Sequence, residues 1–597
     1  MATDLFLGID VGSQSARTVL VDVRGKVLST AERAVSVFVD PSNPNIVEQS
    51  SAEIWQACVE AATSAISSAQ QSPQCAATGR PAGDFRECVR GVGFTSTCST
   101  LVLDADCHPQ CVSPAAAGNP HHDVIMWMDH RGEKQAAAAR HSSKLREVSA
   151  DAPDPFWLTA ERHACKLLWL KENMPDVYAA TAHVLDLSDW LVMKATGASD
   201  SSFPRSLCAL TAKFNYRHDD NRAGVNTAIA AAQGWPRSAY AAAGLEDHVA
   251  DDFQRLGQLV QRPGTAVGQG LCAEAARAFG LVPGTAVSAS LIDAHAGALG
   301  VLGVSVGKST ATAAAEEQSS EGFCGRAALI CGTSTCLMVG KASGPGCYIM
   351  PAGWVHESGQ SAVGDLLHHI VSRHAAVGQL DEYGDGDVFT RLNRYVLQLG
   401  GDQWPLLAAD VHVLPDFRGN RAPLGDDSIR GMISGLSLDS GLESLARVYV
   451  ATLIGLALGV RFIFDSIARR DEADTALPEL LIACGGVALK NELYLQAHTD
   501  AVSMPVAVAS EKESVALGAA MLGAAASGTA SLSECMKRMA PRARLVRGCG
   551  CRDFFTRKYA VYLGLLSEQR KCQRLMQASE TGVCAAATET LLENLLS

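Results

Sequence analysis

Two segments with the same pattern lie in the two halves of the 597-residue chain and restrict the folds open to it. The first reads LFLGIDVGSQSARTVLVD from Leu5, and the second reads AALICGTSTCLMVG from Ala327. Each has an apolar run, a short turn of glycine and hydroxyl-bearing residues, and a second apolar run, which predicts two strands joined by a tight turn. Elsewhere apolar strand patterns alternate with helical ones, as is typical of α/β layers. The sequence therefore predicts two similar α/β lobes.

The overall composition excludes several classes of protein. The length favours two or more domains. The formal charge of −13, from 50 basic and 63 acidic residues, argues against non-specific nucleic-acid binding, which needs clustered Lys and Arg. The 19 cysteines are scattered along a long chain, which indicates reduced thiols in a cytosolic protein. No basic segment followed by an apolar core begins the sequence, so secretion is not expected.

The longest apolar run, Val448–Phe464, raises the question of a membrane span. Arg461 interrupts it, and it is shorter than the ~20 residues that a bilayer requires. We therefore expect a buried helix within about Leu442–Arg469 and no membrane partner.

The first turn has the composition of a phosphate-binding loop. Small side chains let the backbone approach a phosphate, and successive N–H groups can surround it. Asp10 would repel a phosphate directly, but it fits if Mg²⁺ lies between them. The alternative is a hairpin whose aspartate only caps the turn. The candidate nucleotide-contacting residues of this turn are Gly12, Ser13, Gln14, Ser15 and Arg17.

Two further turns strengthen the nucleotide interpretation. Gly332, Thr333 and Ser334 occupy the equivalent turn in the second half of the chain. The segment ACGGVALKN exposes backbone at Gly485 and Gly486, where a base or ribose could lie, and Asn491 lies on the helix that follows. A Gly-Gly pair after a strand is by itself usually only a turn, so this third element depends on the other two.

Asp293 is the candidate catalytic base. It ends the apolar run of VSASLIDAHAGALG and precedes a run of small residues, so its carboxylate can project from the end of a strand. Phosphoryl transfer to an alcohol needs an acceptor for one proton, and a loose transition state lets a carboxylate of ordinary pKa serve. The alternative is a helix N-cap, a role that aspartate commonly fills.

The order of these motifs resembles that of the FGGY carbohydrate kinases, members of the actin-like ATPase superfamily, over about Leu5–Met576. GIDVGSQSAR resembles the first phosphate motif of that family, ICGTSTC the second, DFRGNRAPLGDDSIRGMISGL the signature of the C-terminal lobe, and ACGGVALKN the adenosine motif. TSTCSTLVLD, MWMDHR, SLIDAHAG and ESGQSAVG are similar to the D-ribulose kinase branch. The resemblance implies two ribonuclease-H-like lobes with ATP and Mg²⁺ in the cleft between them. It also implies Asp293 as general base, Asp10 and Asp293 near the metal, and D-ribulose as the acceptor.

The resemblance also implies a set of sugar-contacting residues. Thr97 and Cys98 lie at the substrate positions of the family, where glycerol kinases carry an Arg-Glu pair. Lys213 matches a lysine of L-ribulose kinases that contacts the ketose, and Glu357 matches a carboxylate from the opposite lobe. Asp129 could accept sugar hydroxyls. Surface ion pairs are the alternative for Asp129, Lys213 and Glu357.

The implied organisation is an N-terminal lobe at 1–305, a connection at 306–326, a C-terminal lobe at 327–540 and a helical tail at 541–597. No role is assigned to Ser309–Gly325. Xylulose, L-ribulose and ribitol remain alternative acceptors, and a non-catalytic ATP-dependent clamp like the chaperone and cytoskeletal relatives remains a different class. The oligomeric state is open, with a homodimer as one option. Cys107, His108 and Cys111 are close in sequence but lack a partner pair at zinc spacing, so no structural metal is expected.

Overall fold

The chain forms two compact units, each of which draws on more than one stretch of sequence. The computed structural model describes residues 4–71, 85–116, 118–148, 157–198, 203–217, 229–230, 234–306, 323, 325–341, 347–350, 353–470 and 477–577. Unit 1 contains residues 1–330, 338–357 and 509–544, and unit 2 contains 331–337, 358–508 and 545–597. The segment Ser309–Gly325 lies outside the described residues except for Phe323 and Gly325. The sequential division at 306–326 stays a prediction.

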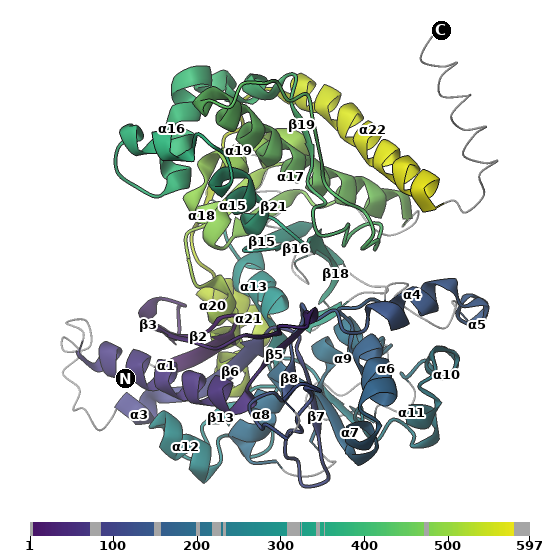
Figure 1. The fold of residues 1–597 in the computed structure, drawn as a ribbon. Helices are drawn as coiled ribbons and strands as arrows, with labels where there is room; N and C mark the ends of the chain where they lie inside the picture. The colour runs from purple at the N-terminus through teal and green to yellow at the C-terminus, as the bar shows by residue number, and fades with distance from the viewer. Residues whose placement is uncertain are drawn as a thin grey trace. The chain divides into compact units, whose positions relative to one another are not determined.

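A mixed sheet forms the centre of unit 1 (Figure 1). Its strand order is β13-β6-β1-β2-β3, and β14 also pairs with β6. β1 is antiparallel to β2 and parallel to β6, which confirms the predicted strand–turn–strand at the start of the chain. The strands are β1 (Leu5–Val11), β2 (Ser15–Asp22), β3 (Val27–Ala34), β6 (Val89–Ser96), β13 (Ala286–Val287) and β14 (Leu291–Ile292).

Helices cover both faces of this sheet, and side-chain alternation along β1 separates them. Leu7 and Ile9 belong to the same apolar core as Ile54 of α1 (Ser51–Gln71). The other face contacts α20 (Ser514–Ala526) so closely that only glycine fits: a Cβ at Gly8 would lie 1.9 Å from the carbonyl oxygen of Ala516. Because α20 contacts β1 and β6, residues 509–544 belong to unit 1, although they follow the second strand–turn–strand segment in sequence.

The rest of unit 1 consists of two smaller sheets and short helices. An antiparallel sheet has the order β4-β5-β8-β7-β9, and a small sheet has the order β10-β12-β11. These strands are β4 (Phe38–Asp40), β5 (Asn43–Gln49), β7 (Thr100–Leu103), β8 (Val124–Ile125), β9 (His183–Asp186), β10 (Arg205–Ser206), β11 (Ile229–Ala230) and β12 (Leu259–Gln261). The helices are α3 (Phe85–Cys88), α4 (Glu133–His141), α5 (Ser143–Glu147), α6 (His163–Asn173), α7 (Pro175–Ala180), α8 (Leu187–Thr196), α9 (Leu207–Lys213), α10 (Arg237–Ala243), α11 (Glu246–Ala250), α12 (Ala273–Phe279), α13 (Asp293–Leu302) and α21 (Leu532–Met539).

The second strand–turn–strand also forms as predicted, as β15 (Arg326–Cys331) and β16 (Thr335–Lys341). β18 (Gly353–Gln360), β16, β15, β21 (Leu480–Cys484) and β22 (Val506–Ala509) are neighbours in that order in one sheet, and β21 is parallel to β22. β17 (Cys347–Met350) pairs with β18, and β23 spans Ala543–Leu545. The helices of unit 2 are α15 (Gly364–Ser372), η3 (Val377–Tyr383), α16 (Val388–Gly400), η4 (Gly401–Ala408), α17 (Leu442–Arg470), α18 (Gly486–Lys490), α19 (Glu492–Val502) and α22 (Arg552–Gln577), with a ribbon of β19 (His412–Leu414) and β20 (Met432–Ser434).

α17 is the helix predicted from the longest apolar run. Among the described parts of the chain, it is the one helix long and apolar enough to cross a membrane by composition. However, 78% of its apolar window is buried inside the structure, and α16, α19 and α22 contact it (Figure 1). This burial is typical of a core helix.

Candidate active site

Three parallel strands bring the predicted catalytic residues to one edge of the main sheet of unit 1. Asp10 on β1 is in register with Thr95 on β6, and Leu291 on β14 pairs with the same Thr95 from the other side. β6 continues into Thr97 and Cys98, and β14 continues into Asp293. Because the carboxyl ends of parallel strands meet at one edge, these side chains lie where α/β proteins commonly bind ligands.

Asp293 is the first residue of α13, and its side chain is half-buried. The N-cap residue is Ile292, and no side chain caps this helix end, so the aspartate is not an N-cap. Its Oδ1 accepts a hydrogen bond of 2.6 Å from the N–H of Ala294. Burial raises the pKa of Asp293 to about 7 against the opposing effects of this N–H and of Lys213. The carboxylate therefore differs from the ordinary one expected from sequence, and its pKa suits a general base near neutral pH.

Asp10 is buried beside Asp293. Burial raises the pKa of Asp10, and repulsion from Asp293 and Glu513 adds to that effect while Arg17 opposes it. Its Oδ1 is buried and accepts no hydrogen bond from the described residues. Two neighbouring carboxylates, one with an unpaired oxygen, fit a Mg²⁺ ion, which prefers oxygen ligands.

The turn after β1 is closed by a hydrogen bond of 2.9 Å from Gly12 N–H to the carbonyl oxygen of Ser15. Several predicted phosphate contacts already have protein partners. Ser15 Oγ and Arg17 Nε both donate to Glu32 Oε1, at 2.6 and 3.0 Å.

The remaining predicted residues of this turn are Ser13 and Gln14. Ser13 Oγ accepts from Trp127 Nε1 at 2.9 Å. Gln14 is exposed, and Gly12 is half-buried. Ser13 is half-buried like Gly12, so Gln14 is the most exposed residue between Gly12 and Ser15.

Lys213 and Glu357 form an ion pair in unit 1. Lys213 Nζ lies 3.1 Å from Glu357 Oε1 and 3.4 Å from Oε2. Burial disfavours both charges, but Cys98 and Glu357 together raise the pKa of Lys213 above its usual value. Burial likewise opposes the Glu357 carboxylate, but Lys213 outweighs it, and the pKa of Glu357 is well below normal. The surface-ion-pair alternative does not apply to this pair, because Lys213 is only 8% exposed and Glu357 19%.

Cys98 is within electrostatic range of Asp293, Lys213 and Glu357, and Thr97 precedes it in the chain. Thr97 is buried, and its Oγ1 lies 3.2 Å from Ser99 Oγ. Cys98 is half-buried. Burial raises the pKa of the Cys98 thiol, and Lys213 opposes this effect.

Asp129 occupies a structural position. It is fully buried, and Oδ2 accepts from the N–H of Val47 at 2.7 Å. Both oxygens also accept from Arg131 Nε, at 2.9 and 3.0 Å, and Oδ1 accepts from the Arg131 N–H. With its lone pairs occupied in this way, the carboxylate has little capacity left for a sugar hydroxyl.

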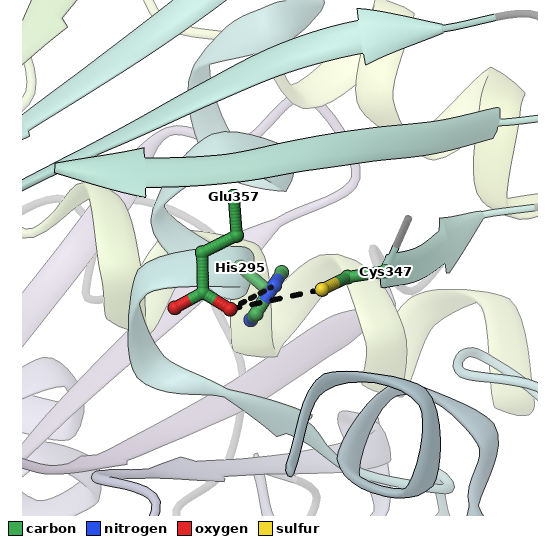
Figure 2. A group of neighbouring side chains, drawn as sticks. All are labelled: His295, Cys347 and Glu357. Carbon is green, nitrogen blue, oxygen red and sulfur yellow. Dashed lines mark hydrogen bonds and ion pairs between the residues drawn. The ribbon is translucent and has the colours of Figure 1, made fainter. Parts of the chain in front are cut away.

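Two residues near Glu357 were not predicted from sequence. Figure 2 shows His295 and Cys347 directed toward the Glu357 carboxylate. His295 Nε2 lies 3.7 Å from Glu357 Oε2, and Cys347 Sγ lies 3.6 Å from the same oxygen. His295 follows Asp293 by two residues in the motif IDAHAG, which could have indicated it, whereas no local pattern indicates Cys347.

The predicted nucleotide-contacting residues of unit 2 lie in two turns and at the start of a helix. Gly332 N–H donates to the carbonyl oxygen of Ser334 at 2.9 Å, and Thr333 accepts from the N–H of Val363. Gly332 and Thr333 are exposed. Gly485 has a φ of +91°, and a Cβ there would lie 2.5 Å from the carbonyl oxygen of Cys331, so glycine is needed where β21 meets the end of β15.

Asn491 is the N-cap of α19. Its Oδ1 accepts from the N–H of Tyr494 at 3.2 Å, and its Nδ2 donates to Tyr449 Oη at 2.7 Å. The side chain is buried. Asn491 therefore holds the start of α19, whereas Gly486, at the start of the preceding helix α18, is exposed.

Comparison with solved structures defines the class of fold. The chain matches a ligand-bound xylulose kinase from Lactobacillus acidophilus with a TM-score of 0.70 at 16% identity, over 96% of this chain and 99% of that one. It matches a xylulose kinase from Rhodospirillum rubrum with a TM-score of 0.68 at 18% identity, over 95% and 99%. The fold is the two-domain, actin-like fold of sugar kinases.

Sequence comparison then gives the family. Residues 5–300 match the N-terminal domain of the FGGY family of carbohydrate kinases, and residues 327–527 match its C-terminal domain. The chain is 40% identical to an FGGY carbohydrate kinase domain-containing protein of Danio rerio, over 97% of this chain and 100% of that protein. It is 28% identical to a D-ribulokinase of Saccharomyces cerevisiae, over 87% of this chain and 72% of that protein. The chain belongs to the FGGY family and is an ATP-dependent carbohydrate kinase.

Proposed function

We propose that the chain phosphorylates a ketopentose, with D-ribulose converted to D-ribulose 5-phosphate. The observation that carries this proposal is the meeting of Asp10, Cys98 and Asp293 at the carboxyl edge of β1, β6 and β14, within electrostatic range of the Lys213–Glu357 pair. Similarity to the yeast D-ribulokinase and to a ribulokinase of Geobacillus thermodenitrificans, 28% identical over 88% of this chain and 86% of that protein, supports a pentulose as the acceptor.

In this proposal Asp293 accepts the proton of the reacting hydroxyl. Its carboxylate is at the start of α13 and accepts one hydrogen bond within the described part of the chain, from Ala294, so lone pairs remain for a sugar hydroxyl. A base whose pKa is near the working pH combines a populated carboxylate with useful basicity.

The sugar is proposed to bind to four residues, Lys213, Glu357, Thr97 and Cys98. An ammonium group donates to a carbonyl or hydroxyl oxygen, and a carboxylate accepts from hydroxyl groups, so the ion pair can hold both kinds of oxygen in a ketose. The small neutral side chains of Thr97 and Cys98 leave space for a chain longer than glycerol. Asp129 is left out of this set because Arg131 and Val47 occupy its oxygens.

The turn of each unit is proposed, by itself, as a nucleotide contact. The N–H groups of Gly12 and Gly332 already donate within their turns, so the other backbone N–H groups and the small side chains of Gly12–Ser15 and Gly332–Ser334 are the ones that suit phosphate oxygens, and Gly485 and Gly486 suit the adenosine. Asp10 and Asp293 would hold Mg²⁺. That ion offsets negative charge on the phosphates.

Xylulose is the alternative acceptor with specific support, because the fold is shared with xylulose kinases. L-Ribulose and ribitol stay alternatives because one hydroxyl configuration depends on few side chains. The cytosolic location and the homodimer stay predictions.

A coupled assay of ADP release tests the proposal with the full-length protein. D-Ribulose, L-ribulose, D-xylulose, ribitol and glycerol are compared at equal concentrations with Mg-ATP. We expect the largest kcat/KM with D-ribulose, and sugar-dependent ADP release about 10²–10⁴-fold slower for the Asp293→Asn variant. A higher kcat/KM with another acceptor would replace D-ribulose, and ATP turnover unaffected by every sugar would favour the non-catalytic clamp.

A further inference from the structure

Three side chains from separate elements of unit 1 converge beside the proposed sugar-binding pair (Figure 2). His295 lies on α13, Cys347 on β17 and Glu357 on β18. Cys347 is paired with Val355 in the β17–β18 ribbon. Because alternate residues of a strand share a face, Glu357 lies on the same face as Val355 and diagonally next to Cys347. The backbone therefore fixes the thiol and the carboxylate as neighbours, and α13 adds the imidazole.

The two separations measured from Glu357 are close to those around a tetrahedral zinc ion. Zinc bonds of ~2.0–2.3 Å at tetrahedral angles place the ligand atoms about 3.3–3.7 Å apart. Glu357 Oε2 lies 3.7 Å from His295 Nε2 and 3.6 Å from Cys347 Sγ. One ligand atom from each of the three residues lies within 4.8 Å of the others. A cation could therefore bind with small movements of these side chains.

His295 supplies independent support for a ligand at this point. Its ring is fully buried, and neither ring nitrogen has a hydrogen-bond partner among the described residues. A buried polar group without a partner is unfavourable and unusual in a native structure. Another buried histidine, His498, has one ring nitrogen satisfied, since its Nδ1 contacts the carbonyl oxygen of Tyr494 at 2.8 Å. His163 is like His295, because both of its ring nitrogens lack a hydrogen-bond partner among the described residues and a carboxylate, that of Asp186, lies nearby. The ring nitrogens of His295 therefore have the capacity to coordinate a ligand.

We infer that His295, Cys347 and Glu357 form a binding site for a divalent cation of the zinc class. A nitrogen, sulfur and oxygen set suits zinc, whereas Mg²⁺ prefers oxygen ligands only, so this site is distinct from the one proposed at Asp10. On binding, the Cys347 thiol releases its proton to solvent and the sulfur donates an electron pair to the metal. The thiolate and the Glu357 carboxylate then balance the two positive charges. The Glu357 side chain is 19% exposed, so an ion can approach its carboxylate from solvent.

Binding at this site would inhibit the kinase. The metal takes Glu357 Oε2, which lies 3.4 Å from Lys213 Nζ, and it places a cation next to the ammonium group. Lys213 and Glu357 are proposed to bind the sugar, and the following prediction rests on that proposed function. Zn²⁺ should inhibit the kinase competitively with the sugar and not with ATP.

The experiment uses Co²⁺ as a spectroscopic substitute for Zn²⁺, added to the reduced full-length protein. We expect one equivalent to produce a thiolate-to-cobalt charge-transfer band that Zn²⁺ abolishes. Cys347→Ser should remove the band, and His295→Gln should weaken Co²⁺ binding at least about tenfold, since even outer partners of a metal contribute that much. Cys572→Ser, which removes an exposed thiol, is the matched control and should keep the band. Circular dichroism confirms that each variant is folded.

The outcomes separate this site from the proposed function. Absence of the band in the unmodified protein, or an unchanged band in folded Cys347→Ser, would overturn the site. If the band appears as expected but D-ribulose does not displace Co²⁺ and Zn²⁺ does not raise the KM for sugar, the cation site stands and the sugar-binding role of Glu357 fails.

Discussion

Lys213 Nζ and Glu357 Oε1 are 3.1 Å apart although 144 residues separate them in sequence. α9 ends at the lysine, and β18 carries the glutamate. Because both side chains are largely buried, each charge is stabilised by the other more than by water. The pair thus links two distant parts of the sequence of unit 1 at the proposed sugar site.

Glu357→Gln should destabilise the protein. It leaves the Lys213 ammonium group buried without its counter-charge, and breaking such a pair typically costs about 3 kcal/mol or more. The free energy of unfolding from urea titrations measures this change. Glu443→Gln breaks an exposed ion pair with Arg447 and should cost at most about 0.5 kcal/mol. Equal effects of the two variants would show that the buried pair contributes no special stability.

Asp293→Asn should lower kcat by about 10²–10⁴-fold, the usual contribution of a general base. The amide oxygen can still accept from Ala294, so the KM for sugar should change little. Steady-state kinetics with D-ribulose and Mg-ATP measures both constants. Asp123→Asn is the control, because Asp123 is also a buried carboxylate and its oxygens accept hydrogen bonds from Ser51, away from the proposed site. A normal kcat for Asp293→Asn would exclude it as the base.

Asp189 on α8 should make stability fall as pH rises. Burial, with repulsion from Asp186, raises the pKa of Asp189 to about 7, compared with ~3.9 in an unfolded chain. A raised folded-state pKa gives stability that is complete below the unfolded pKa and is lost as pH rises through 7. In this window the slope is up to about 1.4 kcal/mol per pH unit.

The Asp189→Asn variant tests this dependence. Its amide oxygen can keep the bonds from Ser206 N–H and Ser290 Oγ, which Asp189 Oδ1 now accepts at 3.0 and 2.9 Å. Urea unfolding at pH 5, 6 and 7 should show a shallower decline than the unmodified protein. Parallel declines for both proteins would mean that Asp189 does not titrate in this range.

Gly485→Ala should destabilise unit 2, and its neighbour offers a matched control. At Gly485 a Cβ would meet the carbonyl oxygen of Cys331 in a backbone conformation that alanine rarely adopts, so the loss should exceed about 1 kcal/mol. At Gly486, the first residue of α18, a Cβ has open space, and alanine favours a helix. The thermal unfolding midpoint should fall only for Gly485→Ala, and a similar fall for both would contradict this account of the turn.

The local features of the fold could be predicted from sequence, because they depend on local patterns. The strand–turn–strand segments at Leu5 and Ala327 and the long helix α17 form as expected. The place of Asp293 at the end of an apolar strand was also predictable. Its raised pKa was not, since the burial and the charge of Asp186 that raise it come from other elements.

The environment of each site residue depended on long-range contacts. Nothing near Asp129 in sequence shows that Val47 would occupy its oxygen. Cys347 has no motif, and only the β17–β18 pairing places it beside Glu357. Asn491 was expected near the nucleotide because of its position after a Gly-Gly turn, but the local start of α19 and Tyr449 hold its side chain.

The close contact of α20 with β1 has a consequence for biosynthesis. Gly8 on β1 is synthesised long before its backbone partner, Ala516. Until α20 is made, one face of the sheet that contains β1 lacks its covering helix, which is the kind of exposed apolar surface that promotes aggregation and chaperone binding. A translation product that ends before α20 would therefore leave one face of this sheet exposed, because the helix that covers that face would be missing.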